Sequence, residues 1–160
     1  MDSFASEVRI VTATLDQIED LIPLFDGYRQ FYKQEHDLAA ARRFLEERLI
    51  LRESVIFLAY LDTRAVGFTQ LYPSFSSVSM QRLWILNDLY VAPEIRGHRI
   101  GEALIEKAAQ FSSRMGAKGL SLETAADNVS AQALYERVSF VRDTEFYRYY
   151  LATPARNEQA

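Results

Sequence analysis

The 160-residue sequence contains no cysteine and only two histidines, His36 and His98. The first absence excludes disulfides, thiolate zinc sites and a cysteine nucleophile, so any chemistry must use other side chains. Two histidines so far apart do not suggest a metal site, and we expect no metal. No apolar run approaches the roughly 20 residues that cross a bilayer, so we expect a cytoplasmic protein without a membrane partner.

An excess of basic residues is also absent, because the formal net charge is -4 and the pI is about 5.3. This balance disfavours a nucleic-acid partner, whose phosphates are bound mainly by clustered Lys and Arg. Apolar residues make up 49% and charged residues 25% of the chain, which is typical of an ordinary globular protein. The length suits a single domain, and we expect one over residues 1–160 with its core at residues 8–151.

Hydrophobic periodicity predicts elements in the order β, α, α, β, β, β, α, β, α, β. Strands are expected at residues 8–13, 55–61, 66–72, 83–91, 120–123 and 145–151. Helices are expected after a capping box of Thr14 and Gln17, over residues 37–50, from Gly101 to a cap at Gly116, and over residues 131–138. Gly27 interrupts the first helix and Pro73 ends the third strand. The order predicts an α/β fold, a mixed sheet with helices on its faces.

One segment has the pattern of a phosphate-binding site. A strand at residues 83–91 leads through a turn with Gly97 into a helix that begins at Gly101. The first turn of a helix has unpaired N–H groups and about half a positive charge, both of which attract an anion. The two glycines let the backbone approach that anion, and Arg96 adds a fixed positive charge.

Two motifs resemble those of the GNAT acetyltransferase superfamily. The hexapeptide Arg96-Gly97-His98-Arg99-Ile100-Gly101 is similar to the family's pyrophosphate loop, and it follows a matching strand end, Leu89-Tyr90-Val91-Ala92-Pro93. Downstream, Asn128, Ala131, Leu134, Tyr135 and Phe140 have the spacing of the family's closing helix. Two motifs in the right order are much more specific than one glycine loop. The resemblance implies the GNAT fold, with a mostly antiparallel mixed sheet, over about residues 8–151.

Two residues depart from the family pattern, and both stand where glycine is usual. They are Arg99 in the loop and Ser139 before Phe140. We expect Arg99 to adopt an ordinary helical conformation, because a left-handed one would cost a non-glycine residue about 1 to 2 kcal/mol. Its side chain would then be free to reach a phosphate of coenzyme A.

The resemblance implies that acetyl-CoA is the co-substrate. In the family, the pantetheine arm pairs with the backbone of the strand before the loop, whose N–H groups also stabilise the developing oxyanion. The residues so predicted to bind coenzyme A are Leu89, Tyr90, Val91, Arg96, Gly97, His98, Arg99, Ile100, Gly101, Glu102, Asn128 and Tyr135. Tyr135 also occupies the family's position for the acid that protonates the departing thiolate.

A base is needed because an amine of pKa near 10.4 is neutral only to about one part in a thousand at pH 7. The sequence Leu86-Asn87-Asp88-Leu89 resembles Hpa-type and polyamine-acetylating members, but Asn87 stands where those tend to have Glu. We take Asp88 as the candidate base, acting directly or through water, with Glu123 on the next strand as second choice.

Aromatic and acidic residues cluster where the family generally builds its acceptor pocket. They are Tyr28, Phe31, Tyr32, Glu35 and Asp37. Aromatic walls with carboxylates suit an alkylammonium guest, and we assign Tyr28, Tyr32, Asp88 and Glu123 to acceptor binding. An ordinary amphipathic helix with solvated acids is the competing interpretation.

The last predicted strand, residues 145–151, has apolar side chains on both faces. Such a strand is often buried at an interface, and several Hpa-type relatives associate through it, so we expect a homodimer. The activity that follows is direct transfer of acetyl from acetyl-CoA to a primary amine: a polyamine, an amino acid, another small amine or a protein lysine. The alternative is a noncatalytic acyl-CoA-binding regulatory domain, which Asn87 favours and Tyr135 opposes.

Overall fold

The computed structural model describes residues 7–155 and contains one five-stranded sheet with the strand order β1-β2-β3-β4-β5. The strands are β1 (Val8–Thr12), β2 (Val55–Leu61), β3 (Arg64–Ser76), β4 (Gln81–Val91) and β5 (Leu120–Ser121). Each pairs antiparallel with the next, except that β4 and β5 are parallel. The predicted mixed, mostly antiparallel sheet is therefore confirmed.

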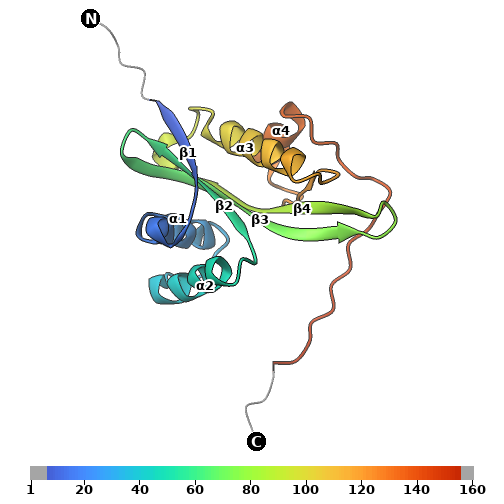
Figure 1. The fold of residues 1–160 in the computed structure, drawn as a ribbon, viewed down its shortest axis with the longest axis horizontal. Helices are drawn as coiled ribbons and strands as arrows, with labels where there is room; N and C mark the ends of the chain where they lie inside the picture. The colour runs from blue at the N-terminus through green and yellow to red at the C-terminus, as the bar shows by residue number, and fades with distance from the viewer. Residues whose placement is uncertain (1–6, 156–160) are drawn as a thin grey trace, which may run out of the picture.

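Four α-helices cover the two faces of this sheet (Figure 1). They are α1 (Ile18–Phe31), α2 (Leu38–Ile50), α3 (Ile100–Arg114) and α4 (Val129–Arg137), with short 3-10 helices η1 (Leu15–Gln17) and η2 (Pro93–Ile95). Helices α1 and α2 bury one apolar cluster against the sheet, and α3 and α4 bury a second on the opposite face. Among residues 7–155, no helix is both long and apolar enough to span a bilayer.

Two predicted interruptions are wrong. Helix α1 continues through Gly27. A Cβ there would lie 2.7 Å from the hydroxyl of Tyr90, so glycine permits close contact between helix and sheet. Strand β3 continues through Pro73, which pairs with Trp84. Its pairing with β2 ends at Leu71, so Pro73 lies where β3 has a single neighbouring strand and a missing N–H is tolerated.

The predicted strand at residues 145–151 is also wrong for the single chain. After α4 the described residues form no further helix or strand, and the segment runs away from the domain (Figure 1). Strand β5 also stops at Ser121, two residues short of the prediction. The predicted capping box of Thr14 and Gln17 is confirmed at the start of η1.

Candidate active site

The sheet opens where β4 and β5 part. Strand β5 pairs with β4 only at Trp84 and Ile85, and the rest of β4 to Val91 has β3 as its one neighbour among the described residues. The predicted coenzyme-binding residues Leu89, Tyr90 and Val91 lie on this unpaired part. An exposed strand edge can bind an extended ligand through main-chain hydrogen bonds, as the prediction requires.

A β-bulge decides where Asp88 points. Gln70 pairs with Asp88 and Leu71 with Leu86, so Asn87 is an extra residue in β4. In a regular strand Asp88 would share the face of Leu86, which is buried in the α3 cluster. The extra residue moves Asp88 to the opposite face, beneath α1, as bulges beside active sites often do.

Asp88 is held there by neutral donors. It is 2% exposed, and its carboxylate accepts hydrogen bonds from Gln70 Nε2 at 2.6 Å and Asn87 Nδ2 at 2.7 Å. Burial raises the pKa of Asp88 above its ordinary value of 3.8, although the hydrogen bonds from Asn87 and Gln70 oppose the rise. A carboxylate with a raised pKa and no cationic partner is a stronger base than an exposed one.

Three aromatic side chains at the end of α1 form a continuous row, and the first of them, Tyr28, lies beside this carboxylate. Tyr28 donates to the main-chain oxygen of Asn87 at 3.3 Å, and its ring centroid lies 5.1 Å from that of Tyr32, which in turn lies 5.2 Å from Phe31. Burial, with a smaller effect of Asp88, raises the pKa of Tyr28, so this hydroxyl stays protonated. We call Tyr28, Phe31 and Tyr32 the acceptor wall.

The loop after β4 has free main-chain donors. Helix α3 begins without a side-chain cap, and its first helical bond joins the Ala103 N–H to the Arg99 oxygen, so the N–H groups of residues 100–102 have no helical acceptor. Gly97 has φ +89°, a conformation that favours glycine. Arg96 lies 5.8 Å from the ring centroid of Phe31, between this loop and the acceptor wall. These features suit a diphosphate.

The predicted helical conformation of Arg99 is wrong. Arg99 is the N-cap of α3 and is left-handed, with φ 58° and ψ 21°. The backbone is extended at Arg96 and must reverse before the first helical residue, and the left-handed residue completes that turn. The side chain is nevertheless exposed, as expected.

Tyr135 is positioned by the end of α4. Ser139 has φ +76°, and the N–H groups of Ser139 and Phe140 donate to Glu136 and Tyr135, which forms a Schellman motif. The motif packs Phe140 against Tyr135 with ring centroids 5.8 Å apart. Burial raises the pKa of Tyr135, with a smaller contribution from Tyr32 of the acceptor wall. Tyr135 therefore keeps its proton at neutral pH.

A sequence profile of the acetyltransferase (GNAT) family matches residues 18–140, which include every element of this site. The chain belongs to the GNAT family. It is thus an acyltransferase, and enzymes of this family use acetyl-CoA.

Individual GNAT relatives agree with this assignment. The uncharacterized N-acetyltransferase YhfO of Bacillus subtilis (strain 168) is 46% identical over 136 residues, or 85% of this chain and 91% of the relative. The thialysine N-epsilon-acetyltransferase of Caenorhabditis elegans is 26% identical over 85% of this chain and 84% of the relative. The crystal structure of a probable acetyltransferase superposes with a TM-score of 0.87 at 45% identity, covering 92% of this chain and 99% of that one.

Other predicted site residues of this GNAT enzyme have different surroundings. Glu123 is exposed and forms an ion pair with Arg148, and no described hydrogen bond or ion pair joins it to Asp88 or the acceptor wall. The Asn128 side chain accepts from the Ala131 N–H at 3.2 Å, so its oxygen caps α4. His98 is exposed in the loop. Their roles in binding stay predictions.

Sequence reasoning missed Gln70, which is fully buried and donates to Asp88. Its Oε1 atom is buried without a described hydrogen-bond partner. A signal was present, because a glutamine inside the apolar run of β3 is unusual unless another polar group pairs with it. Its link to Asp88, however, depends on the bulge at Asn87, which periodicity does not reveal.

Proposed function

We propose that this GNAT enzyme transfers the acetyl group of acetyl-CoA directly to a primary amine of a small molecule, such as a polyamine or an amino acid, or of a protein lysine. The observation that carries the proposal is the buried carboxylate of Asp88, which lies beside Tyr28 of the acceptor wall and next to the unpaired edge of β4. An aromatic wall around an anion suits an alkylammonium group. The thialysine acetyltransferase among the relatives acts on such an amine by its name, which supports this acceptor class.

The loop and strand edge would hold acetyl-CoA, which supplies a thioester carbonyl for attack by the amine nitrogen. The free N–H groups at the start of α3, with Arg96 and Arg99, bind the diphosphate. The Ala92 N–H bonds to Val66 of β3, and alternate residues of a strand face opposite edges. Leu89 and Val91, on either side of Tyr90, therefore offer their main-chain groups to the pantetheine arm. Asn128 retains its amide N–H groups for the same ligand, because only its oxygen is used in the cap.

Two side chains would move protons. Asp88 removes the proton that the acceptor amine must lose, directly or through water, and its raised pKa makes it a better acceptor than an ordinary carboxylate. Tyr135, whose raised pKa keeps the hydroxyl protonated, donates to the departing thiolate sulfur. Without a cysteine in the sequence to hold the acetyl group, transfer takes place in one ternary complex.

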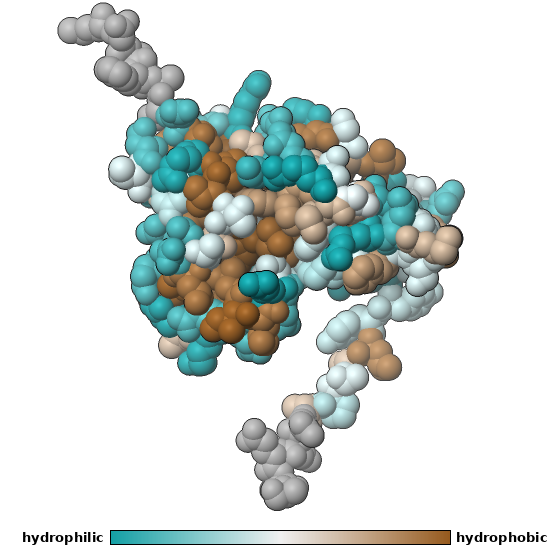
Figure 2. All heavy atoms as spheres, in the orientation of Figure 1, coloured by the Kyte–Doolittle hydropathy of each residue, from teal (hydrophilic) through white to brown (hydrophobic). Residues whose placement is uncertain are grey.

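A homodimer is also part of this proposal. Residues 146–151 expose five large apolar side chains: Phe146, Tyr147, Tyr149, Tyr150 and Leu151. Figure 2 shows this segment projecting from the body of the molecule. Its ion pair between Arg148 and Glu123 brings it past the end of β5, which pairs with no strand other than β4 among residues 7–155. Because one chain has both an extended apolar segment and a free edge, two copies would be self-complementary and form a closed dimer.

The test is release of free CoA thiol from acetyl-CoA with a panel of polyamines, amino acids, other small amines and lysine peptides. We expect turnover with at least one of them. The Tyr135→Phe protein should lose about 10²- to 10⁴-fold in kcat with little change in the KM for acetyl-CoA. A protein that binds acetyl-CoA but releases no thiol with any amine would contradict the proposal, and an unchanged kcat would remove Tyr135 from the mechanism.

A further inference from the structure

Two carboxylates are buried among the described residues, and the proposed reaction uses only one of them, Asp88. The other is Asp26 on α1, which is 2% exposed. Burying a charge is costly unless several donors converge on it. Asp26 lies two residues before Tyr28 of the acceptor wall, so the reason for its burial bears on the site.

Three donors converge on the Asp26 carboxylate. Gln30 Nε2 lies 2.8 Å and His36 Nδ1 2.5 Å from Oδ2, and the Asp37 main-chain N–H lies 2.9 Å from Oδ1. Burial by itself raises the pKa of Asp26, but the hydrogen bonds from Asp37, His36 and Gln30 together lower it below its ordinary value of 3.8. Asp26 is therefore ionised at neutral pH and can only accept, so Nδ1 of His36 carries the donated proton.

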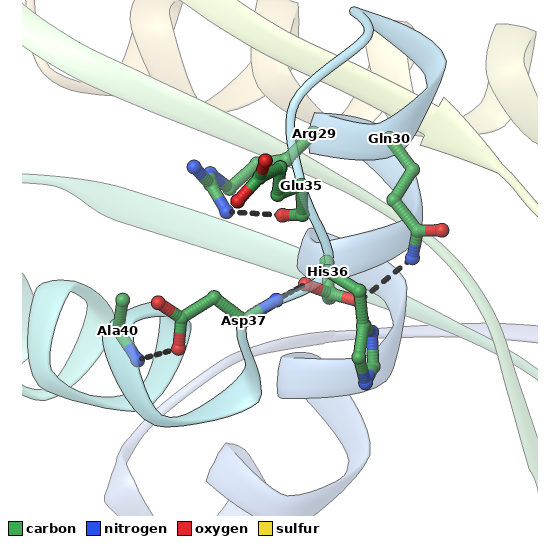
Figure 3. Close-up of polar contacts among 7 residues, drawn as sticks. Arg29, Gln30, Glu35, His36, Asp37 and Ala40 are labelled. Atoms are coloured by element: carbon green, nitrogen blue, oxygen red, sulfur yellow. Dashed lines mark hydrogen bonds and ion pairs between the residues drawn. The ribbon is translucent and has the colours of Figure 1, made fainter.

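These donors come from two parts of the polypeptide, α1 and its connection to α2. Figure 3 shows Gln30 on α1 and Asp37 at the end of the connection to α2, both hydrogen-bonded to one carboxylate, which is that of Asp26 and also accepts from His36. Arg29 Nη1 adds a hydrogen bond to the main-chain oxygen of Glu35 at 3.2 Å. Asp37 in turn caps α2 by accepting from the Ala40 N–H at 2.9 Å. Asp26 thus ties the C-terminal end of α1 to the first turn of α2.

The tied connection begins with Tyr32 of the acceptor wall. Helix α1 ends at Phe31, and Lys33 reverses the chain with φ +62°. Tyr32 is 46% exposed, so its position depends on this turn and on the rings of Tyr28 and Phe31 more than on core packing. A change in the path of residues 33–37 would therefore move Tyr32.

We propose that Asp26 is a positioning residue for the acceptor wall: it holds the connection between α1 and α2 so that Tyr32 keeps its orientation beside Tyr28. The inference rests on the proposed function in that the wall receives the amine. Asp26 itself touches neither substrate in this scheme, because its hydrogen bonds are all with α1 and the connection.

Asp26→Asn tests this role, because an amide NH₂ in place of one oxygen cannot accept from the donors on that side. We expect the KM for the acceptor amine to rise about tenfold, while kcat and the KM for acetyl-CoA change less than about twofold. The matched control is Asp20→Asn, on the same helix, which replaces the charged acceptor of a 2.6 Å hydrogen bond from Tyr60 by a neutral amide oxygen, far from the wall along α1. The control should lower thermal stability but leave the ratio of the KM for the acceptor amine to the KM for acetyl-CoA unchanged.

Amide hydrogen exchange provides a readout that needs no acceptor. Residues 32–40 should exchange faster in Asp26→Asn than in the wild type, and Asp20→Asn should leave them unchanged. Unchanged exchange there, or equal changes in both KM values, would overturn the role of Asp26. A wild-type protein that acetylates no amine would instead contradict the proposed function, whichever result the exchange experiment gives.

Discussion

At the scale of single residues, the chemistry depends on the surroundings of a carboxylate more than on its identity. Asp88 and Glu123 were both candidates for the base, but Asp88 is buried under Tyr28 with neutral donors, whereas Glu123 is exposed beside Arg148. Removal from water raises a carboxyl pKa, and a cationic partner opposes the rise. The geometry therefore supports Asp88 as the stronger base.

The pH dependence of kcat/KM follows from this environment. Activity should rise with pH through the pKa of Asp88, above the ordinary carboxyl value of 3.8, because the ionised form is the base. Asp88→Asn should remove this limb of the profile and lower kcat/KM by about 10²- to 10⁴-fold. Glu123→Gln is the control and should keep both rate and profile; the opposite pattern would make Glu123 the base.

The stability of the same variant separates chemistry from folding. Folding raises the pKa of Asp88, so the folded protein binds the carboxyl proton more tightly than the unfolded chain does. This contribution to the free energy of unfolding is fully present below the ordinary pKa of 3.8 and is lost as pH rises through the pKa of the folded state. Asn cannot ionise, so the free energy of unfolding of Asp88→Asn does not fall with pH for this reason. In addition, rotation of the Gln70 amide would let its Oε1 accept a hydrogen bond from the new NH₂ group. The variant should therefore be no less stable than the wild type at neutral pH by thermal unfolding.

At the scale of elements, two turns use a left-handed residue other than glycine beside the proposed coenzyme site. Arg99 begins α3, and Ser139 ends α4 in the Schellman motif that supports Tyr135. Each conformation costs a residue with a Cβ about 1 to 2 kcal/mol. Each residue adopts this costly conformation because it completes the turn at its end of the helix, before α3 for Arg99 and after α4 for Ser139.

Glycine at either position should stabilise the protein. Relief of the left-handed strain exceeds the entropy cost of glycine, which is about 0.5 to 1 kcal/mol, so we expect a net gain of about 0.5 to 1 kcal/mol and a Tm higher by about 1 to 4 °C. Ser139→Gly should leave acetyl-CoA affinity unchanged by calorimetry, whereas Arg99→Gly should weaken it. Equal affinity in both variants would show that the Arg99 side chain binds no phosphate, and a lower Tm for both would contradict the strain.

At the scale of the whole molecule, the segment after α4 has large apolar side chains that are not buried within one chain. Its side chains at Phe146, Tyr147, Tyr149 and Tyr150 are between 79% and 89% exposed. Contiguous exposed aromatic side chains on one segment are typical of an interface. A second copy of the chain is the proposed partner.

Light scattering after gel filtration tests the dimer. We expect the wild type to have twice the 18.4 kDa mass of one chain, and the double variant Tyr147→Ser/Tyr149→Ser to have the mass of one chain. Val78→Ser is the control, because Val78 is 97% exposed in the turn between β3 and β4 and its loss should not change the mass. A monomeric wild type at high protein concentration would refute the dimer.

The sequence by itself determined most elements and the coenzyme motif. Strand β2 has its predicted bounds, and α2 differs from prediction by one residue, because apolar periodicity and capping are local properties. Tyr135, Arg96 and Gly97 were predicted as site residues from motifs whose spacing is equally local, and their roles stay predictions.

Only the tertiary structure decided which residues meet. The bulge at Asn87 turns Asp88 to the face of the sheet that α1 covers. The Tyr90 hydroxyl leaves room only for glycine at position 27 of that helix, and the connection to α2 folds back so that Asp37 donates to Asp26. Residues 145–151 have the composition of a strand but find no partner strand in one chain. The reason is physical: periodicity records which side chains prefer burial, whereas pairing, register and contact depend on segments that are distant along the chain.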